Sequence, residues 1–251
     1  MKSRSPFLVA SLALLGLFAC ASSVPAPIPA PVPSSESPPG YVIHPAPKPP
    51  KYISADLFEE FKRKIVHPPK PGSRAQKSDE AELFKLQKER TAADCERAAD
   101  EVKIDLESFM GESKPILSEA ELRELRVAFR QFLNDADYYV QKLKVAFPRD
   151  RPFVYLKGIE PCIAKEVTKS YPSGHAAISR LYARILGELI PQEKRRFLEL
   201  ADSFGRDRVL GGVHHPTDIL AGKQLGDLVY SKLRKSPEYR KWVKEFFTPK
   251  R

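Results

Sequence analysis

Three short segments of the chain place basic side chains and histidines where helices are expected to begin or end. They are KVAFPRDRP, with Lys144, Arg149 and Arg151; YPSGH, with Ser173, Gly174 and His175; and GRDRVLGGVHHPTD, with Arg206, Arg208, His214, His215 and Asp218. The first turn of a helix has free backbone N–H groups and the positive end of the helix dipole, and both favour anions. These segments therefore predict an anion-binding site built from helix boundaries.

The Pro-Ser-Gly-His sequence stands directly before an apolar helical run. Ser173 is a good N-cap, and Gly174 has no side chain to keep an anion away from the backbone. We expect the amides of Ser173 and Gly174 to form an oxyanion cradle with His175 beside it. Taken alone, Ser-Gly-His is more often a helix cap with an incidental histidine, so the hypothesis depends on the other two segments.

The histidine segment has a spacing that suits nucleophilic catalysis. Asp218 follows His214 by four residues, so a carboxylate in the first helical turn can accept the Nδ1 proton and leave Nε2 as the nucleophile. A zinc site with His215 is the alternative, because imidazole and carboxylate are ordinary zinc ligands. Adjacent histidines do not readily aim at one ion, and no third clear ligand stands nearby, so we predict no metal.

The elements that must position these segments are helices. From about Ala55 onward apolar residues recur at helical spacing, and extended alternation is nearly absent. The predicted helices lie at 80–109, 118–147 with a Ser118–Glu121 capping box, 173–190, from Pro191 toward Phe204, from Pro216, and from Pro237 after the cap Ser236. We predict an all-α chain with one compact helical-bundle domain over residues 51–251.

The first fifty residues have the composition of an export segment and a spacer. Residues 1–20 carry Lys2 and Arg4 before an apolar run too short to span a bilayer comfortably, which is typical of a signal peptide. The sequence LFAC resembles a lipobox, which predicts lipidation of Cys20; ordinary cleavage after Ala21 is the alternative. Residues 21–50 are rich in proline and predict an extended tether. The expected location is the periplasm, with anchoring to the outer membrane.

Two further properties bear on partners and covalent structure. Cys95 and Cys162 either pair in an oxidising compartment or remain separate buried thiols, and spacing alone does not decide between them. The formal charge of +10 is spread over many helical faces and does not form one basic block. We therefore expect a solvated basic surface and no nucleic-acid partner.

Taken together, the three segments resemble the signature of the type 2 phosphatidic acid phosphatase (PAP2) superfamily, shared with vanadium haloperoxidases. Its parts are Lys-x6-Arg-Pro, Pro-Ser-Gly-His and Arg-x5-His-x3-Asp, here Lys144 to Pro152, Pro172 to His175 and Arg208 to Asp218. From about Lys51 onward the chain resembles the bacterial class A non-specific acid phosphatases, with GSRAQKSDEA at 72–81 as a further likeness. Two residues depart from that class: Asp207 replaces serine and Ala176 replaces threonine.

The resemblance implies a metal-independent acid phosphatase without cofactors. His214 would form a phosphohistidine with Asp218 holding its tautomer, and His175 would protonate the leaving alcohol. The groups expected to bind phosphate are Lys144, Arg151, Arg208 and the amides of Ser173 and Gly174. The implied substrates are small phosphomonoesters such as nucleotides, with transfer to alcohols as a possible side reaction and vanadate as an inhibitor. The oligomeric state is open and includes a homo-oligomer.

Three alternatives remain at this point. A vanadate-dependent haloperoxidase would use the same pocket. A membrane lipid phosphatase needs further apolar runs of about 20 residues, which the chain lacks after its first segment. A non-catalytic, anchored anion-binding lipoprotein has no need of both histidines. Asp207, beside the phosphate-binding arginine, would weaken anion binding if it pointed inward; pointing outward, it would orient Arg206 or Arg208.

Overall fold

The computed structural model describes residues 41–42, 46–110 and 117–247, with 41–42 described by their backbone alone. The predicted signal peptide, Cys20 and most of the tether lie outside these residues. The elements are β1 (Tyr41–Val42), a 3-10 turn (Ala55–Leu57), α1 (Phe58–Lys64), α2 (Arg74–Glu89), α3 (Ala92–Asp100), α4 (Glu107–Met110), α5 (Glu119–Ala146), α6 (Pro152–Tyr155), β2 (Lys165–Glu166), α7 (Gly174–Leu189), a 3-10 turn (Pro191–Glu193), α8 (Lys194–Leu210), α9 (Pro216–Leu233) and α10 (Pro237–Phe246). The domain is all-α, as predicted.

The helix starts are explained by local sequence. Ser118 forms a capping box with Glu121, whose carboxylate accepts from the Ser118 N–H at 2.7 Å. Ser173 caps α7 by accepting from the Ala176 N–H at 3.3 Å, and Ser236 caps α10 in the same way. Pro216 occupies the first turn of α9, where a missing N–H costs no helical hydrogen bond. The capping residues predicted from sequence are therefore confirmed.

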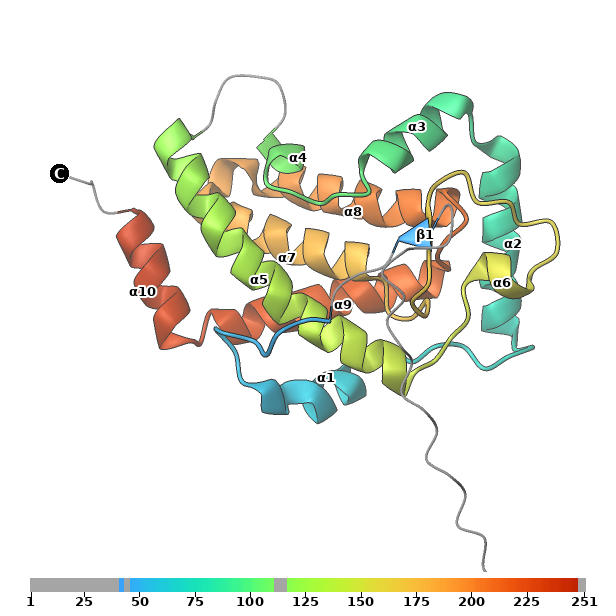
Figure 1. Cartoon of the computed structure of the whole chain (residues 1–251), viewed down its shortest axis with the longest axis horizontal. Helices are drawn as coiled ribbons and strands as arrows, with labels where there is room; N and C mark the ends of the chain where they lie inside the picture. Colours follow the sequence, from blue (N-terminus) through green and yellow to red (C-terminus); the bar gives the residue numbers. More distant parts are fainter. Residues whose placement is uncertain (1–40, 43–45, 111–116, 248–251) are drawn as a thin grey trace, which may run out of the picture. The chain divides into compact units, whose positions relative to one another are not determined.

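Helix α7 is the centre of the domain. It packs against α8 and α9 along most of its length and is crossed by α5 (Figure 1). Its apolar residues are almost completely buried, and aromatic rings from the surrounding helices, among them Phe109, Phe129 and Phe204, close the core around Tyr182. Because α5, α7, α8 and α9 each end or begin near one another, the core packing also brings helix termini together.

Two helical stretches differ in their limits from the expectation. The stretch 80–109 is not one helix, because α2 ends at Glu89, α3 spans Ala92–Asp100 behind a Thr91 cap, and α4 begins at Glu107. Helix α8 runs to Leu210 and not merely toward Phe204, so Arg208 lies in its last turn and not in a loop. The helix stops where Gly212 takes a φ of +79°, a conformation that other residues rarely adopt.

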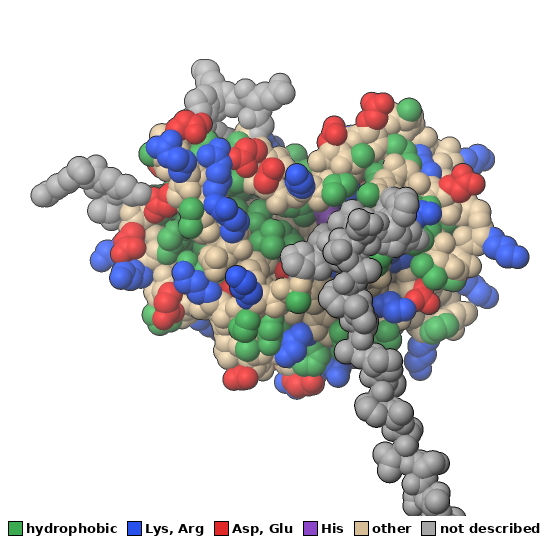
Figure 2. Space-filling model, viewed as in Figure 1, with side chains coloured by type: hydrophobic (Ala, Val, Ile, Leu, Met, Phe, Trp, Pro, Cys, Tyr) green, Lys and Arg blue, Asp and Glu red, His purple; other side chains and the backbone are tan. Residues whose placement is uncertain are grey.

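The remaining features are small. β1 and β2 form a two-residue parallel pair, with Tyr41 opposite Lys165 and Val42 opposite Glu166. Within the described ranges no helix is both long and apolar enough to cross a membrane. On the face in Figure 2, Lys and Arg side chains alternate with Asp and Glu and do not gather in one basic patch.

Candidate active site

The structure brings the predicted residues together at one end of α7. Their positions are Lys144 in the last turn of α5, Arg151 before α6, Ser173, Gly174 and His175 at the start of α7, Arg208 in the last turn of α8, and His214 and Asp218 at the start of α9. Lys144, Gly174 and His175 line a pocket of about 290 Å³. The backbone N–H of His214 donates to the Arg208 carbonyl at 3.2 Å, which connects the last two segments.

His214 is held with a defined ring orientation. Its Nδ1 lies 3.3 Å from Asp218 Oδ2, and its Nε2 lies 3.3 Å from Arg151 Nη1. A guanidinium only donates hydrogen bonds, so the contact with Arg151 requires the lone pair on Nε2 and places the proton on Nδ1. Burial and the positive charge of Arg151 lower the pKa of His214 to about 3. The ring is therefore neutral near neutral pH, with Nε2 as its free nucleophilic nitrogen.

Asp218 is more heavily bonded than the sequence suggested. Its Oδ2 accepts from Ser170 Oγ at 2.5 Å and from the backbone N–H of His215 at 2.8 Å, and its Oδ1 accepts from Arg149 Nη1 at 2.8 Å. Burial alone would raise its pKa, but the hydrogen bonds from His214 and His215 and the charge of Arg149 hold that pKa well below its usual value. Asp218 is thus a fixed carboxylate that orients His214.

A second carboxylate, from α2, fixes the groups around Asp218. Asp79 Oδ2 accepts from Arg149 Nη2 at 2.8 Å and from Thr217 Oγ1 at 2.5 Å, while Arg149 also donates to Thr217. Sequence reasoning noted Arg149 and the segment around Asp79 without giving either a role. The one signal in the sequence was the likeness of the segment 72–81 to the class A phosphatases. The role of Asp79 in that segment becomes clear only from the packing of α2 beside α9.

The phosphate-binding candidates are buried cations with unequal surroundings. Lys144 is buried, and burial together with the charge of Arg151 lowers its pKa to about 7. Arg208 donates through Nη2 to the Ala98 carbonyl, and its buried Nε has no hydrogen-bond partner within the described residues. A buried guanidinium N–H without a partner is costly, which makes Arg208 a ready donor for an anion.

One expected donor is engaged elsewhere. The Ser173 N–H donates to the backbone carbonyl of Asp218 at 3.0 Å, contrary to our expectation that this amide faces the anion. The cause is the tight contact between the starts of α7 and α9, which the sequence does not reveal. The Ser173 hydroxyl accepts from Ala176 as a cap and keeps its own proton for donation.

His175 has its own tautomer set by a carbonyl. Its Nε2 lies 3.0 Å from the Val102 oxygen, and since a carbonyl only accepts, Nε2 carries the proton. Nδ1 then faces Glu166, at 3.9 Å from Oε1. Burial and the charge of Arg208 lower the pKa of His175 to about 4. The two histidines therefore carry their protons on different nitrogens.

Glu166 was missed by the sequence reasoning because no motif contains it. Its carboxylate accepts a hydrogen bond from Arg151 Nη2 and lies 3.3 Å from the Thr168 hydroxyl. Burial would raise its pKa, but the charges of Arg151, His175 and His214 lower it below the usual range. A carboxylate thus lies among the groups expected to bind phosphate.

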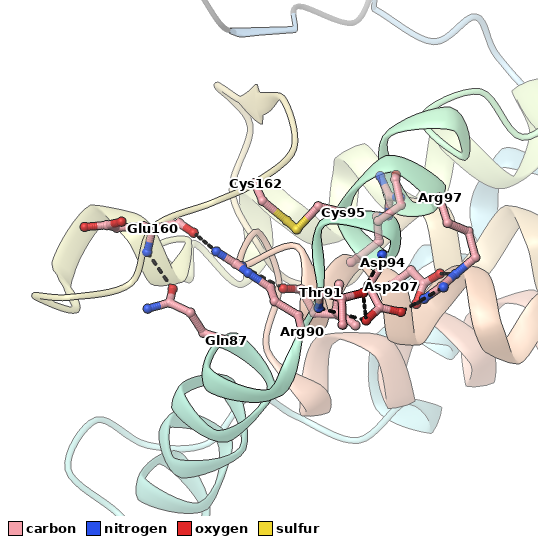
Figure 3. The surroundings of a disulfide bond; sticks show 12 residues. Gln87, Arg90, Thr91, Asp94, Cys95, Arg97, Glu160, Cys162 and Asp207 are labelled. Carbon is pink, nitrogen blue, oxygen red and sulfur yellow. Dashed lines mark hydrogen bonds and ion pairs between the residues drawn. A yellow bond between two sulfur atoms is a disulfide. The ribbon is translucent and has the colours of Figure 1, made fainter.

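Asp207 points away from the pocket. It accepts from Arg97 of α3, with Nε at 2.9 Å and Nη2 at 3.3 Å (Figure 3). The outward orientation was one of our two expectations, but the partner is Arg97 and neither Arg206 nor Arg208. Burial and the charge of Asp207 raise the pKa of the neighbouring Glu101 to about 7. The substitution of Asp for Ser is therefore compensated within α3 and α8.

Cys95 and Cys162 form a disulfide, which resolves the alternative left open by the sequence. It joins α3 to the loop that leads to β2, as Figure 3 shows. Arg90 reinforces the same junction by donating to the Leu210 carbonyl at 2.9 Å and to the Glu160 carbonyl at 2.5 Å. Within the described part of the chain, no three His, Cys, Asp or Glu side chains are grouped so as to hold a metal ion.

Comparison with known proteins agrees with this geometry. The chain is 26% identical over 210 residues to the non-specific acid phosphatase of Salmonella typhimurium, covering 76% of this chain and 84% of that protein. It is 28% identical over 135 residues to the non-specific acid phosphatase of Providencia stuartii, covering 51% and 54%. A bacterial vanadium-dependent iodoperoxidase has the same fold, with a TM-score of 0.57 and 17% identity over 72% of this chain and 54% of that one. Residues 127–240 match the PAP2 superfamily, and the chain therefore contains a PAP2 superfamily domain.

Proposed function

We propose that this protein is an acid phosphatase that hydrolyses small phosphomonoesters, such as nucleotides, through a phosphohistidine on Nε2 of His214. The observation that carries the proposal is the orientation of His214, whose Nδ1 is bonded to Asp218 and whose Nε2 lone pair meets Arg151. The likeness to the non-specific acid phosphatases supports the reaction class.

The first step breaks the ester P–O bond and forms a P–N bond to His214. Phosphoryl transfer depends mainly on positioning and charge stabilisation. Lys144, Arg151 and Arg208 would bind the non-bridging oxygens with Gly174 and the Ser173 hydroxyl, because all of them lie around the start of α7. His175 carries its proton on Nε2, so to protonate the leaving alcohol through Nδ1 it would first take up a second proton and act as the imidazolium.

In the second step water takes the phosphoryl group from His214 and restores the free imidazole. An alcohol in place of water would give transfer of the phosphoryl group. Asp218 remains a carboxylate throughout and stabilises the charge that His214 carries as a phosphohistidine. The scheme uses no metal and no cofactor, and vanadate, which resembles the pentacoordinate transition state, is expected to inhibit.

The N-terminal segments would place this activity outside the cytoplasm. Residues 1–20 would direct export, a lipid on Cys20 would anchor the protein to the outer membrane, and residues 21–50 would act as a tether. Support comes from the composition of these residues alone. Mass spectrometry of the mature N-terminus tests it, because a lipidated Cys20 and a free Ser22 differ in mass.

The test of the reaction is phosphate release from p-nitrophenyl phosphate by the purified protein with EDTA present. His214→Ala should lose roughly 10³-fold or more of kcat/KM, the order seen when a catalytic nucleophile is removed. His67→Ala is the matched control, since His67 is exposed and bonds only to the Lys62 carbonyl. Orthovanadate should inhibit the wild type, and acid quench should trap an acid-labile phosphoprotein absent from His214→Ala.

Two results would contradict the proposal. One is activity that disappears with EDTA and returns with a divalent cation. The other is a folded protein that turns over no phosphomonoester but oxidises halide when vanadate and peroxide are supplied, which would favour the haloperoxidase alternative.

A further inference from the structure

The pocket at the start of α7 contains an acidic side chain that the proposed reaction does not use. Glu166 lines the same cavity of about 290 Å³ as Lys144, Gly174 and His175. Its side chain is 13% exposed, so its carboxylate is largely removed from bulk water. An acid in an anion-binding pocket needs a physical explanation, because two like charges at close range repel strongly in a buried site.

The Arg151 guanidinium connects Glu166 with the nucleophile. Its Nη1 faces His214 Nε2 at 3.3 Å, while its Nη2 donates to Glu166 Oε2. The two amino groups of one planar guanidinium are close neighbours. A phosphoryl group that bonds to His214 Nε2 and contacts Arg151 must therefore lie beside the Glu166 carboxylate.

Glu166 is not required to hold Arg151 in place. Arg151 Nε donates to the Thr168 carbonyl at 2.7 Å, and Nη1 donates to the Val213 carbonyl at 3.0 Å. These two bonds from different sides fix the plane of the guanidinium. A purely structural role for the Glu166 carboxylate is therefore weakly supported by the geometry.

Within the described residues, charged and titratable groups from several elements act on Glu166. They are Arg151 before α6, Lys144 of α5, His175 of α7, Arg208 of α8 and His214 before α9, with the Thr168 hydroxyl in its own loop. The cations keep Glu166 ionised over the whole working range. It therefore presents a carboxylate, an acceptor without a proton, to any phosphate in the pocket.

We propose that Glu166 is a specificity-determining residue that makes the pocket accept the phosphate group as a monoanion, with one proton shared between a phosphate oxygen and the Glu166 carboxylate. This inference rests on the proposed function. A P–OH group donates a short, charge-assisted hydrogen bond to a carboxylate, whereas an unprotonated oxygen at the same place is repelled.

The proton balance of binding follows directly. A phosphomonoester loses its second proton with a pKa of about 6. Below that pH the monoanion enters with its proton. Above it, a dianion must take up one proton from solvent as it binds, so affinity falls about tenfold for each further pH unit. The selectivity therefore favours substrate binding at acidic pH, in addition to the protonation that His175 needs as the general acid.

The first experiment compares Glu166→Gln with the wild type at one pH, using sulfate and methyl sulfate as competitive inhibitors. Neither anion titrates near neutrality, one is a dianion and the other a monoanion. Glu166→Gln should bind sulfate about tenfold more tightly and methyl sulfate only about threefold more tightly, because the negative charge that it removes repels a dianion about twice as strongly, in free energy, as a monoanion. Both inhibition constants are measured at one pH with the same free enzyme. The starting protonation of Lys144 is therefore the same for sulfate and for methyl sulfate.

Glu160→Gln is the matched control. Glu160 lies in the same loop, but its side chain is exposed and only its backbone is bonded, to Gln87 and Arg90. This variant removes the same charge and should leave both inhibition constants unchanged. Weaker binding of both anions by Glu166→Gln, or equal changes for both, would overturn the inference and assign Glu166 to positioning Arg151.

A second measurement needs no variant. Calorimetry of the wild type in buffers with different ionisation enthalpies, at about pH 8, counts the protons taken up with each ligand. Binding of inorganic phosphate should take up about one proton more than binding of sulfate. The sulfate measurement serves as the correction for proton uptake by Lys144. Equal uptake would refute the shared proton even if turnover is normal. An absence of turnover in the wild type would instead refute the proposed function, while anion binding still tests Glu166.

Discussion

The two sides of the pocket are held together in different ways. The nucleophile side, meaning Lys144, Ser173, His214 and Asp218, is built on α5, α7 and α9, which are packed tightly against one another. The outer wall, meaning α3 and the loop of residues 156–170, contributes only a few buried apolar side chains, Ala98, Ile159 and Ile163, to two small clusters. It is held by the Cys95–Cys162 disulfide, the Arg97–Asp207 ion pair and the Arg90 hydrogen bonds.

This difference indicates which parts of the site tolerate change. Close packing fixes many atoms at once, so the position of the nucleophile cannot be adjusted without disturbing the core. Cross-links are local and can be altered one at a time. The outer wall carries Glu166, and Val102, two residues beyond α3, contacts His175 through its carbonyl. This side of the pocket is therefore where variation can change substrate preference while the reaction is retained. The following predictions are ordered by their expected effect on kcat/KM.

The largest effect is expected where α9 touches the start of α7. A Cβ on Gly222 would lie 2.5 Å from the Ser173 carbonyl oxygen and 2.8 Å from the Ala176 Cβ. Gly222→Ala should therefore displace the start of α7, lowering stability by about 1–3 kcal/mol and kcat/KM by roughly 10²-fold. Thermal unfolding and steady-state kinetics measure both effects.

The sign of the stability change distinguishes a steric conflict at Gly222 from the effect of helix propensity. Helix propensity alone would make Gly222→Ala stabilising by about 0.8–1.0 kcal/mol. Ser231→Ala, at an exposed position of the same helix, is the control for substitutions that meet no steric conflict. A more stable and fully active Gly222→Ala protein would mean that the nucleophile side is not fixed by close packing.

The outer wall should respond in the opposite way. Replacing both Cys95 and Cys162 by alanine removes a link between residues 67 positions apart and should lower the free energy of unfolding by about 2–5 kcal/mol. Turnover should fall less than tenfold because, among the described residues, only Ser170 of the outer wall bonds to His214 and Asp218, and their other bonds come from elsewhere. The expected result is a clear loss in unfolding temperature with activity largely kept at low temperature.

Reduction of the wild type by dithiothreitol provides a control that changes no residue. It should reproduce the unfolding temperature of the double variant and leave that variant itself unaffected. A loss of activity as large as that in Gly222→Ala would mean that the outer wall positions the catalytic groups, and the contrast between the two sides would fail.

Much of the site was predictable because its residues are chemically distinctive and closely spaced within their segments. His214 and Asp218 lie within one helical turn, so their contact follows from helix geometry. The all-α class likewise follows from periodicity. Glu166 was not predictable, because it belongs to a segment of ordinary composition. Asp79 and Ser170 lie in or beside segments that the sequence singled out, but their roles depend on the packing of distant elements.

The same reasoning explains the errors in detail. The N–H of Ser173 was assigned to the anion because a helix start has free donors, yet the approach of α9 supplies the Asp218 carbonyl. Arg208 was expected beyond a helix that runs toward Phe204, whereas α8 continues to Leu210. Local sequence specifies caps and faces well, whereas contacts between helix ends depend on the whole fold.

The smallest effect on turnover is expected at Glu101, and it should appear in stability instead. Its pKa is raised from 4.5 to about 7, first by burial and then by the charge of Asp207, although Arg208 lies 3.9 Å away. The folded protein therefore binds more protons than the unfolded chain between these two values. Stability from this group is complete below about pH 4.5 and is lost as pH rises to about 7.

Glu101→Gln should therefore resemble the protonated side chain at every pH. At about pH 4.5 its free energy of unfolding should equal that of the wild type, and above pH 7 it should be higher, by on the order of 1 kcal/mol. Denaturant unfolding at several pH values measures the difference, and Glu96→Gln, an exposed residue of α3, should show no such dependence. A Glu101→Gln protein that is less stable above pH 7 would mean that the Glu101 charge stabilises Arg208, so that the outer wall depends on its ion pairs more than on the disulfide.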